Sequence, residues 1–198
     1  RGVTVLLIEK GLDAALIPYG ASDRPAEEIV QIVKDHQSAL EGLFAFVKQN
    51  RVLSKSYVCE LHQVITAHQA TVPAKDTLGN LREVALLRGQ FKKMPNNPMV
   101  PGKGLHEYCP PEQVESEMDR LLTWHGEHVA AGVTPEVEAA WFHHRFTQIH
   151  PFQDGNGRVA RALASLVLIK GGYFPLLVTR DDRSEYLESL AAADQSNL

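Results

Sequence analysis

Cysteine is scarce in this chain of 198 residues, which contains only Cys59 and Cys109. The two lie far apart in the sequence and form no CxxC motif, so neither a disulfide-stapled miniprotein nor a paired-cysteine metal motif is expected. Reduced thiols of this kind are typical of a cytoplasmic protein, which is the location we expect.

Long apolar runs and a basic surplus are also missing. No stretch of 18 or more apolar residues occurs, which excludes a transmembrane helix on sequence grounds. The apolar segment 3–8 is too short for a signal peptide, and Glu9 and Lys10 follow it. The formal net charge is −4, which is unsuited to neutralising a nucleic-acid backbone. We therefore expect neither a membrane nor a nucleic acid as a partner.

The composition is that of a globular domain, with 44% hydrophobic and 22% charged residues. Residues 3–9 are typical of a short strand, and residues 90–100 of a short hairpin. Apolar residues recur at helical spacing in six segments, about 26–48, 54–70, 111–129, 135–149, 156–170 and 182–193. Together, the helical and strand patterns predict a mostly α fold with a small β element.

The most informative segment runs from His150 to Arg161. A loop with Gly155 and Gly157 leads directly into a helix, so backbone N–H groups and the helix N-terminus form an anion site. Arg158 and Arg161 are three residues apart and share one helix face, which suits a polyphosphate.

The same loop carries an acid and an imidazole. Asp154 is a hard oxygen ligand placed to hold Mg²⁺ on bound phosphates, and His150 can accept a proton near neutral pH. Taken alone, each feature is commonly structural: a Gly-Asn-Gly before a helix is usually a turn, and paired arginines usually form a surface face. Their combination predicts a nucleoside triphosphate site with a general base at its edge.

Residues 150–161 read His-Pro-Phe-Gln-Asp-Gly-Asn-Gly-Arg-Val-Ala-Arg. The segment resembles the Fic family signature, His-x-Phe-x-(Asp/Glu)-Gly-Asn-Gly-Arg-x-x-Arg, at every fixed position. The resemblance implies a Fic-type helical bundle with a small β-hairpin flap. It also implies a protein adenylyltransferase that moves AMP from ATP, with Mg²⁺ as cofactor, to a Ser, Thr or Tyr hydroxyl of a target protein or of itself. Gly157, where the related Doc kinases carry lysine, favours nucleotidyl transfer over phosphorylation.

By position, the resemblance makes His150 the base that takes the hydroxyl proton and Asp154 the ligand of Mg²⁺. It assigns the anion hole to the glycines and the asparagine of the loop, the β- and γ-phosphates to the arginines, and the adenine to the last helix. These nucleotide-binding residues are Gly155, Asn156, Gly157, Arg158, Arg161, Tyr186 and Asp194.

Residues 88–92 resemble the Gly-x-Phe/Tyr-Arg stretch that opens the Fic flap, with Lys92 in place of the usual arginine. Residues of about 88–109 would then form the flap, which in the family clamps the target protein by strand addition. Leu105 or His106 would pin the target segment. The alternative is an ordinary proline-rich loop.

Residues 38–42, Ser-Ala-Leu-Glu-Gly, resemble the Fic inhibitory motif, with the serine one position out of register. A glutamate in a helix is usually solvated. Gly42 inside a helix costs about 0.5–1 kcal/mol relative to alanine, and close approach to another backbone would explain that cost. The resemblance implies that Glu41 pairs with Arg161 and restrains the enzyme. In some family members this glutamate also supports removal of AMP.

We divide the chain into an N-terminal extension (1–22), a candidate inhibitory helix (23–50) and a Fic core (51–198). Two alternatives stay open: a non-catalytic protein-interaction module that uses the flap and the first helix, and Fic-type transfer of another phosphate-containing group. Self-association is also open, because Fic proteins often associate through helical faces, but no stripe in this sequence favours it.

Overall fold

The computed structural model describes residues 26–75, 80–100, 104–179 and 181–195. The mostly α fold is confirmed, and the strand expected over residues 3–9 lies outside the described residues. In chain order the elements are α3 (Ala26–Lys48), α4 (Lys55–Ile65), β1 (Thr71–Lys75), β2 (Leu81–Ala85), β3 (Met99–Val100), β4 (Gly104–Leu105), a 3₁₀ turn (Pro111–Gln113), α5 (Val114–Ala130), α6 (Pro135–Ile149), α7 (Asn156–Lys170) and α8 (Arg183–Ala193).

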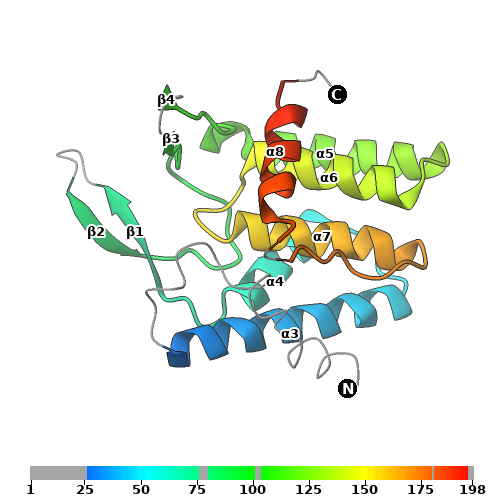
Figure 1. The fold of residues 1–198 in the computed structure, drawn as a ribbon, viewed down its shortest axis with the longest axis horizontal. Helices are drawn as coiled ribbons and strands as arrows, with labels where there is room; N and C mark the ends of the chain where they lie inside the picture. The colour runs from blue at the N-terminus through cyan, green and yellow to red at the C-terminus, as the bar shows by residue number, and fades with distance from the viewer. Residues whose placement is uncertain (1–25, 76–79, 101–103, 180, 196–198) are drawn as a thin grey trace.

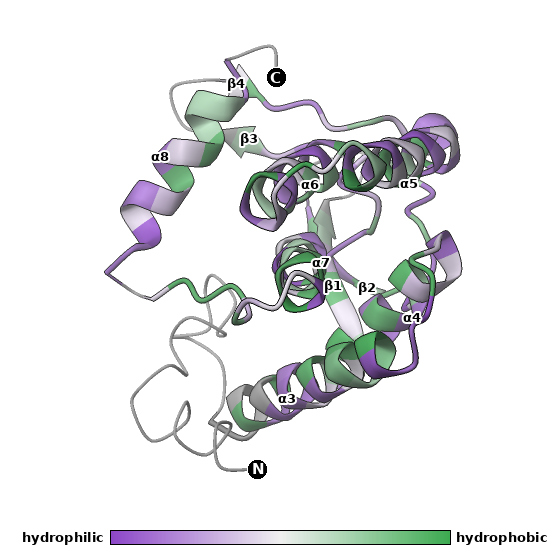
Figure 2. Cartoon of the chain, turned by 90° about the vertical axis from the view of Figure 1, so that its right-hand side faces the viewer, coloured by the Kyte–Doolittle hydropathy of each residue, from purple (hydrophilic) through white to green (hydrophobic). Residues whose placement is uncertain are grey.

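Helix α7 lies at the centre of the fold, between the α5–α6 pair on one side and α3 with α4 on the other (Figure 1). In Figure 2, where α5, α6 and α7 are seen nearly along their axes, α7 again lies between the α5–α6 pair and α3 with α4. Most residues of α7 are buried, so its N-terminal end, where the signature loop enters, is held by packing on several sides. The largest fully buried side chains are Phe46, Phe142, Phe146, Phe152, Leu43, Ile65, Met118, Leu121, Ile149, Leu163, Leu166 and His62.

Two short antiparallel hairpins project from the helices. In the first, β3 pairs with β4 and Met99 lies opposite Leu105. A hairpin therefore lies within the expected flap of about 88–109, but residues 90–94 form no strand, so the hairpin predicted over residues 90–100 is wrong in its first strand. In the second, β1 pairs with β2 and Thr71 lies opposite Ala85. The sequence pattern did not predict this second hairpin, because Pro73 interrupts β1 and four of the five residues of β2 are exposed, which leaves no clear apolar alternation.

Helix α4 ends at Ile65, before the predicted end at Ala70. The hydroxyl of Thr66 donates to the carbonyl oxygen of His62 at 2.7 Å, and the backbone N–H of Thr66 donates to the same oxygen at 3.0 Å. Side-chain bonds of this kind compete with continued helix. The chain therefore turns after Thr66 and passes beside the signature loop.

Two features expected from the composition, the state of the cysteines and the lack of a membrane-spanning helix, can be compared with the described residues. Cys59 and Cys109 are free thiols, as predicted. Within the described ranges, no helix is long and apolar enough to cross a membrane. The domain boundaries at residues 22 and 50 stay predictions.

Gly42 lies in the interior of α3, and a Cβ built on it would meet no atom of the described residues within 4 Å. Among these residues, the prediction that another backbone approaches Gly42 closely is therefore wrong. We expect Gly42→Ala to raise the free energy of unfolding by about 0.5–1 kcal/mol, because alanine favours the helix and restricts the unfolded chain. Urea denaturation measures the change, and a loss of stability would show that this position needs glycine.

Candidate active site

The signature loop is closed by the side chain of Asn156, the first residue of α7. Its Oδ1 accepts the backbone N–H of Phe152 at 2.8 Å, and its Nδ2 donates to the carbonyl oxygen of Phe152 at 2.7 Å. The residue is only 2% exposed. The amide of Asn156 therefore holds the loop together, which leaves only its backbone N–H for the predicted anion-hole role.

Phe152 attaches the loop to α4 through His62. The two rings stack with centroids 3.9 Å apart and planes 7° apart. The Nδ1 of His62 accepts the N–H of Gly89 at 2.8 Å, and its Nε2 donates to the carbonyl oxygen of Asp154 at 3.0 Å. Burial lowers the pKa of His62 to about 4, so the ring is neutral at pH 7, as these two bonds require. One histidine thus joins α4, the start of the flap and the loop.

Two glycines keep the N-terminus of α7 accessible. Gly155 has a φ of 79°, and a Cβ there would lie 3.1 Å from Cγ2 of Thr66, so an L side chain is disfavoured by both conformation and space. A Cβ at Gly157 would lie 3.4 Å from Nη1 of Arg161, which places that guanidinium at the same helix end. The first N–H groups of a helix have no partner within it. The structure thus brings the glycines and Arg161 together as an anion site requires.

The two arginines of the signature have different surroundings. Arg158 is 7% exposed, and its Nη1 and Nη2 donate to the carbonyl oxygen of Ile65 at 3.4 Å and to Oε1 of Gln69 at 2.5 Å. Arg161 is only partly buried, and no described residue forms an ion pair with it. Arg161 is therefore better placed to bind a phosphate, whereas Arg158 also holds the turn after α4.

Asp154 presents a half-exposed carboxylate at the edge of the loop. Its side chain is 47% exposed, and its Oδ2 accepts Nε2 of Gln69 at 2.5 Å. In nucleotide sites Mg²⁺ binds one or two carboxylates together with phosphates and water, so a single carboxylate beside an anion site fits the expected metal. Within the described residues, no cluster of three or more His, Cys, Asp or Glu side chains is arranged to hold a metal by itself.

His150 ends α6 in a left-handed conformation, with φ 50° and ψ 57°. Its Nδ1 lies 3.3 Å from the carbonyl oxygen of Thr147, which can only accept, so Nδ1 carries the proton and Nε2 is the basic nitrogen. The ring stacks on Tyr108, with centroids 3.7 Å apart and planes 12° apart. Burial and the charge of Lys92 lower the pKa of His150 to about 4. At pH 7 the imidazole is neutral and able to accept a proton.

Lys92 is a buried cation at the start of the flap. It is 3% exposed, and its Nζ donates to Oδ1 of Asn96 at 2.9 Å. Burial lowers the pKa of Lys92 to about 8, so the amine is still mostly charged at pH 7. Its charge is therefore one of the groups that keep His150 neutral.

Lys92→Met is expected to raise the pKa of His150, because the variant removes a positive charge that disfavours the imidazolium. If neutral His150 accepts the proton in the reaction, the rate of the variant should begin to fall at a higher pH than that of the wild type as the solution is made more acidic. NMR titration of the His150 ring measures this pKa, and Lys93→Met, at the adjacent exposed position, is the control. An identical His150 pKa in both variants would contradict the assignment.

The base of the flap is tied to the signature loop. The backbone N–H of Lys92 donates to the carbonyl oxygen of Pro151 at 2.8 Å. The Nδ2 of Asn96 donates to the carbonyl oxygen of Phe152 at 2.9 Å. Two hydrogen bonds thus hold the base of the flap against the loop that follows His150.

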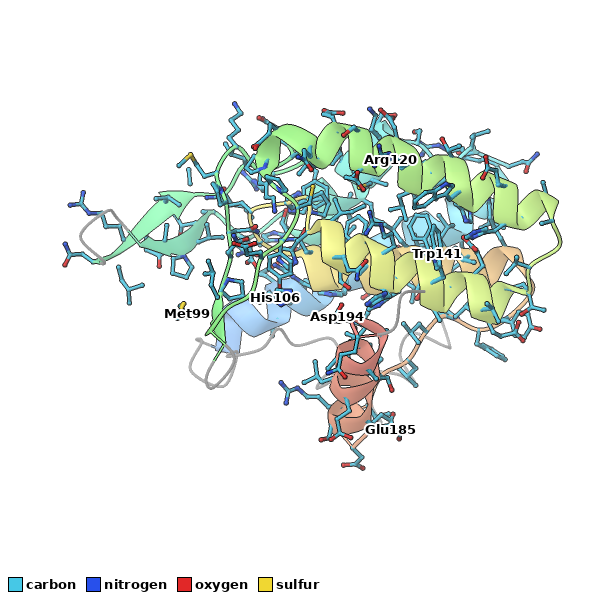
Figure 3. All side chains as sticks on the ribbon, turned by 90° about the horizontal axis from the view of Figure 1, so that it is seen from above. Met99, His106, Arg120, Trp141, Glu185 and Asp194 are labelled. Carbon is cyan, nitrogen blue, oxygen red and sulfur yellow. The ribbon has the colours of Figure 1, made fainter. Side chains whose placement is uncertain are left out.

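The tip of the flap is exposed. Met99 is 69% and Leu105 is 53% exposed, and Figure 3 shows Met99 at the end of the flap, well away from α8. The ring of His106 meets Tyr108 edge-on, with centroids 4.7 Å apart. Because Tyr108 stacks on His150, a continuous row of rings leads from the flap to the candidate base.

The residues expected to contact adenine attach α8 to α6 in this structure. The hydroxyl of Tyr186 lies 2.9 Å from Nε2 of His143, and Oδ1 of Asp194 lies 2.9 Å from Nε2 of His144. Figure 3 shows α8 projecting from the other helices, with Asp194 at its inner end and Glu185 pointing outward. Both predicted contact groups therefore already have partners.

The expected pair between Glu41 and Arg161 is not formed. Glu41 is exposed, and its Oε1 accepts Nε2 of Gln37 at 3.2 Å. Helix α3 buries Ala39 and Leu43, and Glu41, two positions from each, points to the opposite side because two helical residues span about 200°.

On α3, His36 lies near enough to Arg158 and Arg161 for their charges to act on it: burial, and to a lesser extent these two charges, lower its pKa to about 4. Its Nδ1 donates to the carbonyl oxygen of Ile32 at 2.8 Å. Its Nε2 is buried and lacks a hydrogen-bond partner among the described residues. The sequence pattern did not single out His36.

Comparison with known proteins agrees with this geometry. The chain matches the model of the Fic/DOC family over residues 52–168. It is 27% identical to protein adenylyltransferase fic-1 of Caenorhabditis briggsae over 199 residues, covering 100% of this chain and 34% of that protein. It is 26% identical to protein adenylyltransferase Fic of Drosophila persimilis over 160 residues, covering 81% of this chain and 28% of that protein. A solved Fic-domain signaling protein from Bacteroides thetaiotaomicron is 29% identical, with a TM-score of 0.72, covering 96% of this chain and 63% of that chain.

A helical bundle whose central helix begins at a glycine loop with an imidazole beside it is the Fic architecture, and the family model matches more than half of the sequence. The chain belongs to the Fic/DOC family. It spans about a third of the length of the curated adenylyltransferases described above.

Proposed function

We propose that this chain is the catalytic part of a protein adenylyltransferase, which moves AMP from ATP to a hydroxyl group of a protein. The proposal depends on one observation: the neutral imidazole of His150 lies one loop away from the helix end formed by Gly155, Gly157 and Arg161. Transfer of a phosphorus group needs positioning and charge stabilisation more than covalent chemistry. The activity named for the curated relatives supports the same reaction class.

In the proposed reaction, Nε2 of His150 takes the proton of the target hydroxyl, whose oxygen attacks the α-phosphorus of ATP. The bond from the α-phosphorus to the oxygen that bridges to the β-phosphate breaks, and pyrophosphate leaves. The N–H groups of the first turn of α7 and the guanidinium of Arg161 bind the phosphate charge. Asp154 would hold Mg²⁺, which neutralises phosphate charge when bound.

Adenine binding by α8 is part of the proposal. For Tyr186 and Asp194 to contact the base, as predicted, the base must replace His143 and His144 as their partners. Because no residue of α8 is buried, the helix can shift at a smaller cost than a core helix.

The flap is the proposed binding place for the target protein. Within the described residues, β3 and β4 pair only with each other, so each strand has a second edge to which an extended segment can bind. The exposed Leu105 beside that edge is placed to contact such a segment.

Intact-mass measurement after incubation with Mg²⁺ and ATP tests the proposed reaction. A gain of one adenylyl group, in the wild type but not in His150→Ala, is the expected result for self-modification. A gain of one phosphate instead would assign the chain to phosphorylation and contradict the proposal.

The restraint expected from Glu41 is tested by Glu41→Gly. If Glu41 inhibits the enzyme by pairing with Arg161, Glu41→Gly should increase AMP incorporation. Because Glu41 is exposed and bonded to Gln37, we expect a rate within about twofold of the wild type, as for most surface substitutions. A larger increase in the incorporation of labelled AMP would show that Glu41 reaches Arg161 in solution.

A further inference from the structure

We propose that Gln69 is a positioning residue that keeps the ion pair between Asp154 and Arg158 from closing to hydrogen-bond distance, so that the carboxylate of Asp154 can still bind a magnesium–nucleotide complex. The inference rests on the proposed function and adds to it a residue outside the signature. Gln69 lies in the turn between α4 and β1, 85 residues before Asp154 in the sequence.

The side-chain amide of Gln69 bonds both charged groups at once. Its Nε2 donates to Oδ2 of Asp154 at 2.5 Å, and its Oε1 accepts Nη2 of Arg158 at 2.5 Å. The amide thus turns its donor to the anion and its acceptor to the cation. The backbone N–H of Gln69 donates to the carbonyl oxygen of Thr66 at 3.0 Å, which fixes the turn from which the side chain extends.

The distance between the Arg158 guanidinium and the Asp154 carboxylate indicates the effect of the Gln69 amide. Nη2 of Arg158 lies 3.5 Å from Oδ2 of Asp154, longer than the roughly 2.7–2.9 Å of a charge-assisted hydrogen bond. Arg158 is 7% exposed, so a guanidinium that lost Gln69 would gain little from water. The carboxylate of Asp154 already forms a long ion pair with it, and without the amide we expect the two groups to close to a direct hydrogen bond.

A direct pair would weaken the metal site. A carboxylate bonded to a guanidinium shares its negative charge with that cation, and a metal ion must then compete for the same oxygens. Gln69 gives Arg158 a neutral acceptor instead. A glutamate at position 69 would not serve equally, because a second carboxylate would face Asp154.

Calorimetry of ATP binding, once with Mg²⁺ and once with EDTA, tests the inference on the full chain. Gln69→Ala should weaken binding of Mg²⁺–ATP about tenfold, which corresponds to about 1.4 kcal/mol. The same variant should weaken binding of metal-free ATP by no more than about twofold. Gln49→Ala, at an exposed turn after α3, is the control and should keep both affinities.

A double-mutant cycle separates positioning from a general structural role. In an Asp154→Ala background, Gln69→Ala should change Mg²⁺–ATP affinity by no more than about twofold, because the carboxylate that it keeps available is gone. Three results would overturn the inference. Gln69→Ala could show the same dependence of ATP affinity on Mg²⁺ as the wild type, or it could weaken binding of Mg²⁺–ATP and metal-free ATP equally. It could also weaken Mg²⁺–ATP binding tenfold in the Asp154→Ala background. If the wild type binds ATP under neither condition, the proposed function itself fails.

Discussion

Replacing His150 with alanine is expected to slow AMP transfer by about 10²–10⁴-fold, the range that a positioned general base contributes. With a pKa lowered to about 4, the imidazole is almost entirely in its proton-accepting form at pH 7. The bond from Nδ1 to Thr147 and the stack on Tyr108 hold Nε2 in place. Alanine removes the acceptor and leaves the hydroxyl proton in place. The rate of pyrophosphate release from saturating Mg²⁺–ATP measures the effect.

ATP affinity separates loss of the base from loss of the fold. His150 ends α6, whereas the anion site lies at the N-terminus of α7. Calorimetry should therefore give His150→Ala a dissociation constant for Mg²⁺–ATP within about twofold of the wild type. A variant that still transfers AMP within tenfold of the wild-type rate would mean that another group takes the proton.

Phe152→Ala is expected to lower the free energy of unfolding by about 3–5 kcal/mol, the usual cost of deleting a buried aromatic ring. Phe152 is fully buried and packs against His62, Phe91 and Phe146, with ring centroids 3.9, 5.4 and 6.4 Å away. The substitution also removes the ring that attaches the signature loop to α4, so activity should fall with stability. Urea denaturation monitored by circular dichroism gives the free energy.

Phe44→Ala is the matched control for the loss of a phenylalanine. Phe44 lies on α3 and is 49% exposed, so its removal should cost much less than that of Phe152. Equal losses in the two variants would show that the loop is not anchored through Phe152.

Much of the helical framework could be predicted because its signals are local. Pro135, at the first position of α6, is a helix-start signal, and the apolar run after Asn156 indicates the extent of α7. The β1–β2 hairpin was missed because its two strands have weak strand patterns. Helix α4 was predicted too long because the apolar spacing does not show that the Thr66 side chain bonds to the carbonyl oxygen of His62, a bond that competes with continued helix.

The signature residues could be predicted, but their partners could not. His150, Asp154 and Arg161 lie within one contiguous motif, whereas Gln69 and Tyr108 reach the loop from distant turns. Pairing across such separations leaves no mark in a single sequence. His62 had a local signal, since it lies four residues after the buried Val58, but a lone histidine on a helix indicates no partner.

The expected role of Glu41 shows the limit of a short motif. Five residues resemble the inhibitory sequence, yet the direction of a helical side chain depends on which face the helix buries. Because Ala39 and Leu43 face the core, Glu41 faces solvent, and a motif match alone does not reveal that register.

ATP labelled at either its α- or its γ-phosphorus distinguishes AMP transfer from phosphorylation, because the two reactions leave different phosphorus atoms on the protein. With Mg²⁺ present, the α-label should become covalently bound to protein and the γ-label should leave in pyrophosphate, and His150→Ala should show neither transfer. Protein that retains the γ-label, or an α-label that is incorporated equally well by His150→Ala, would contradict the proposed reaction.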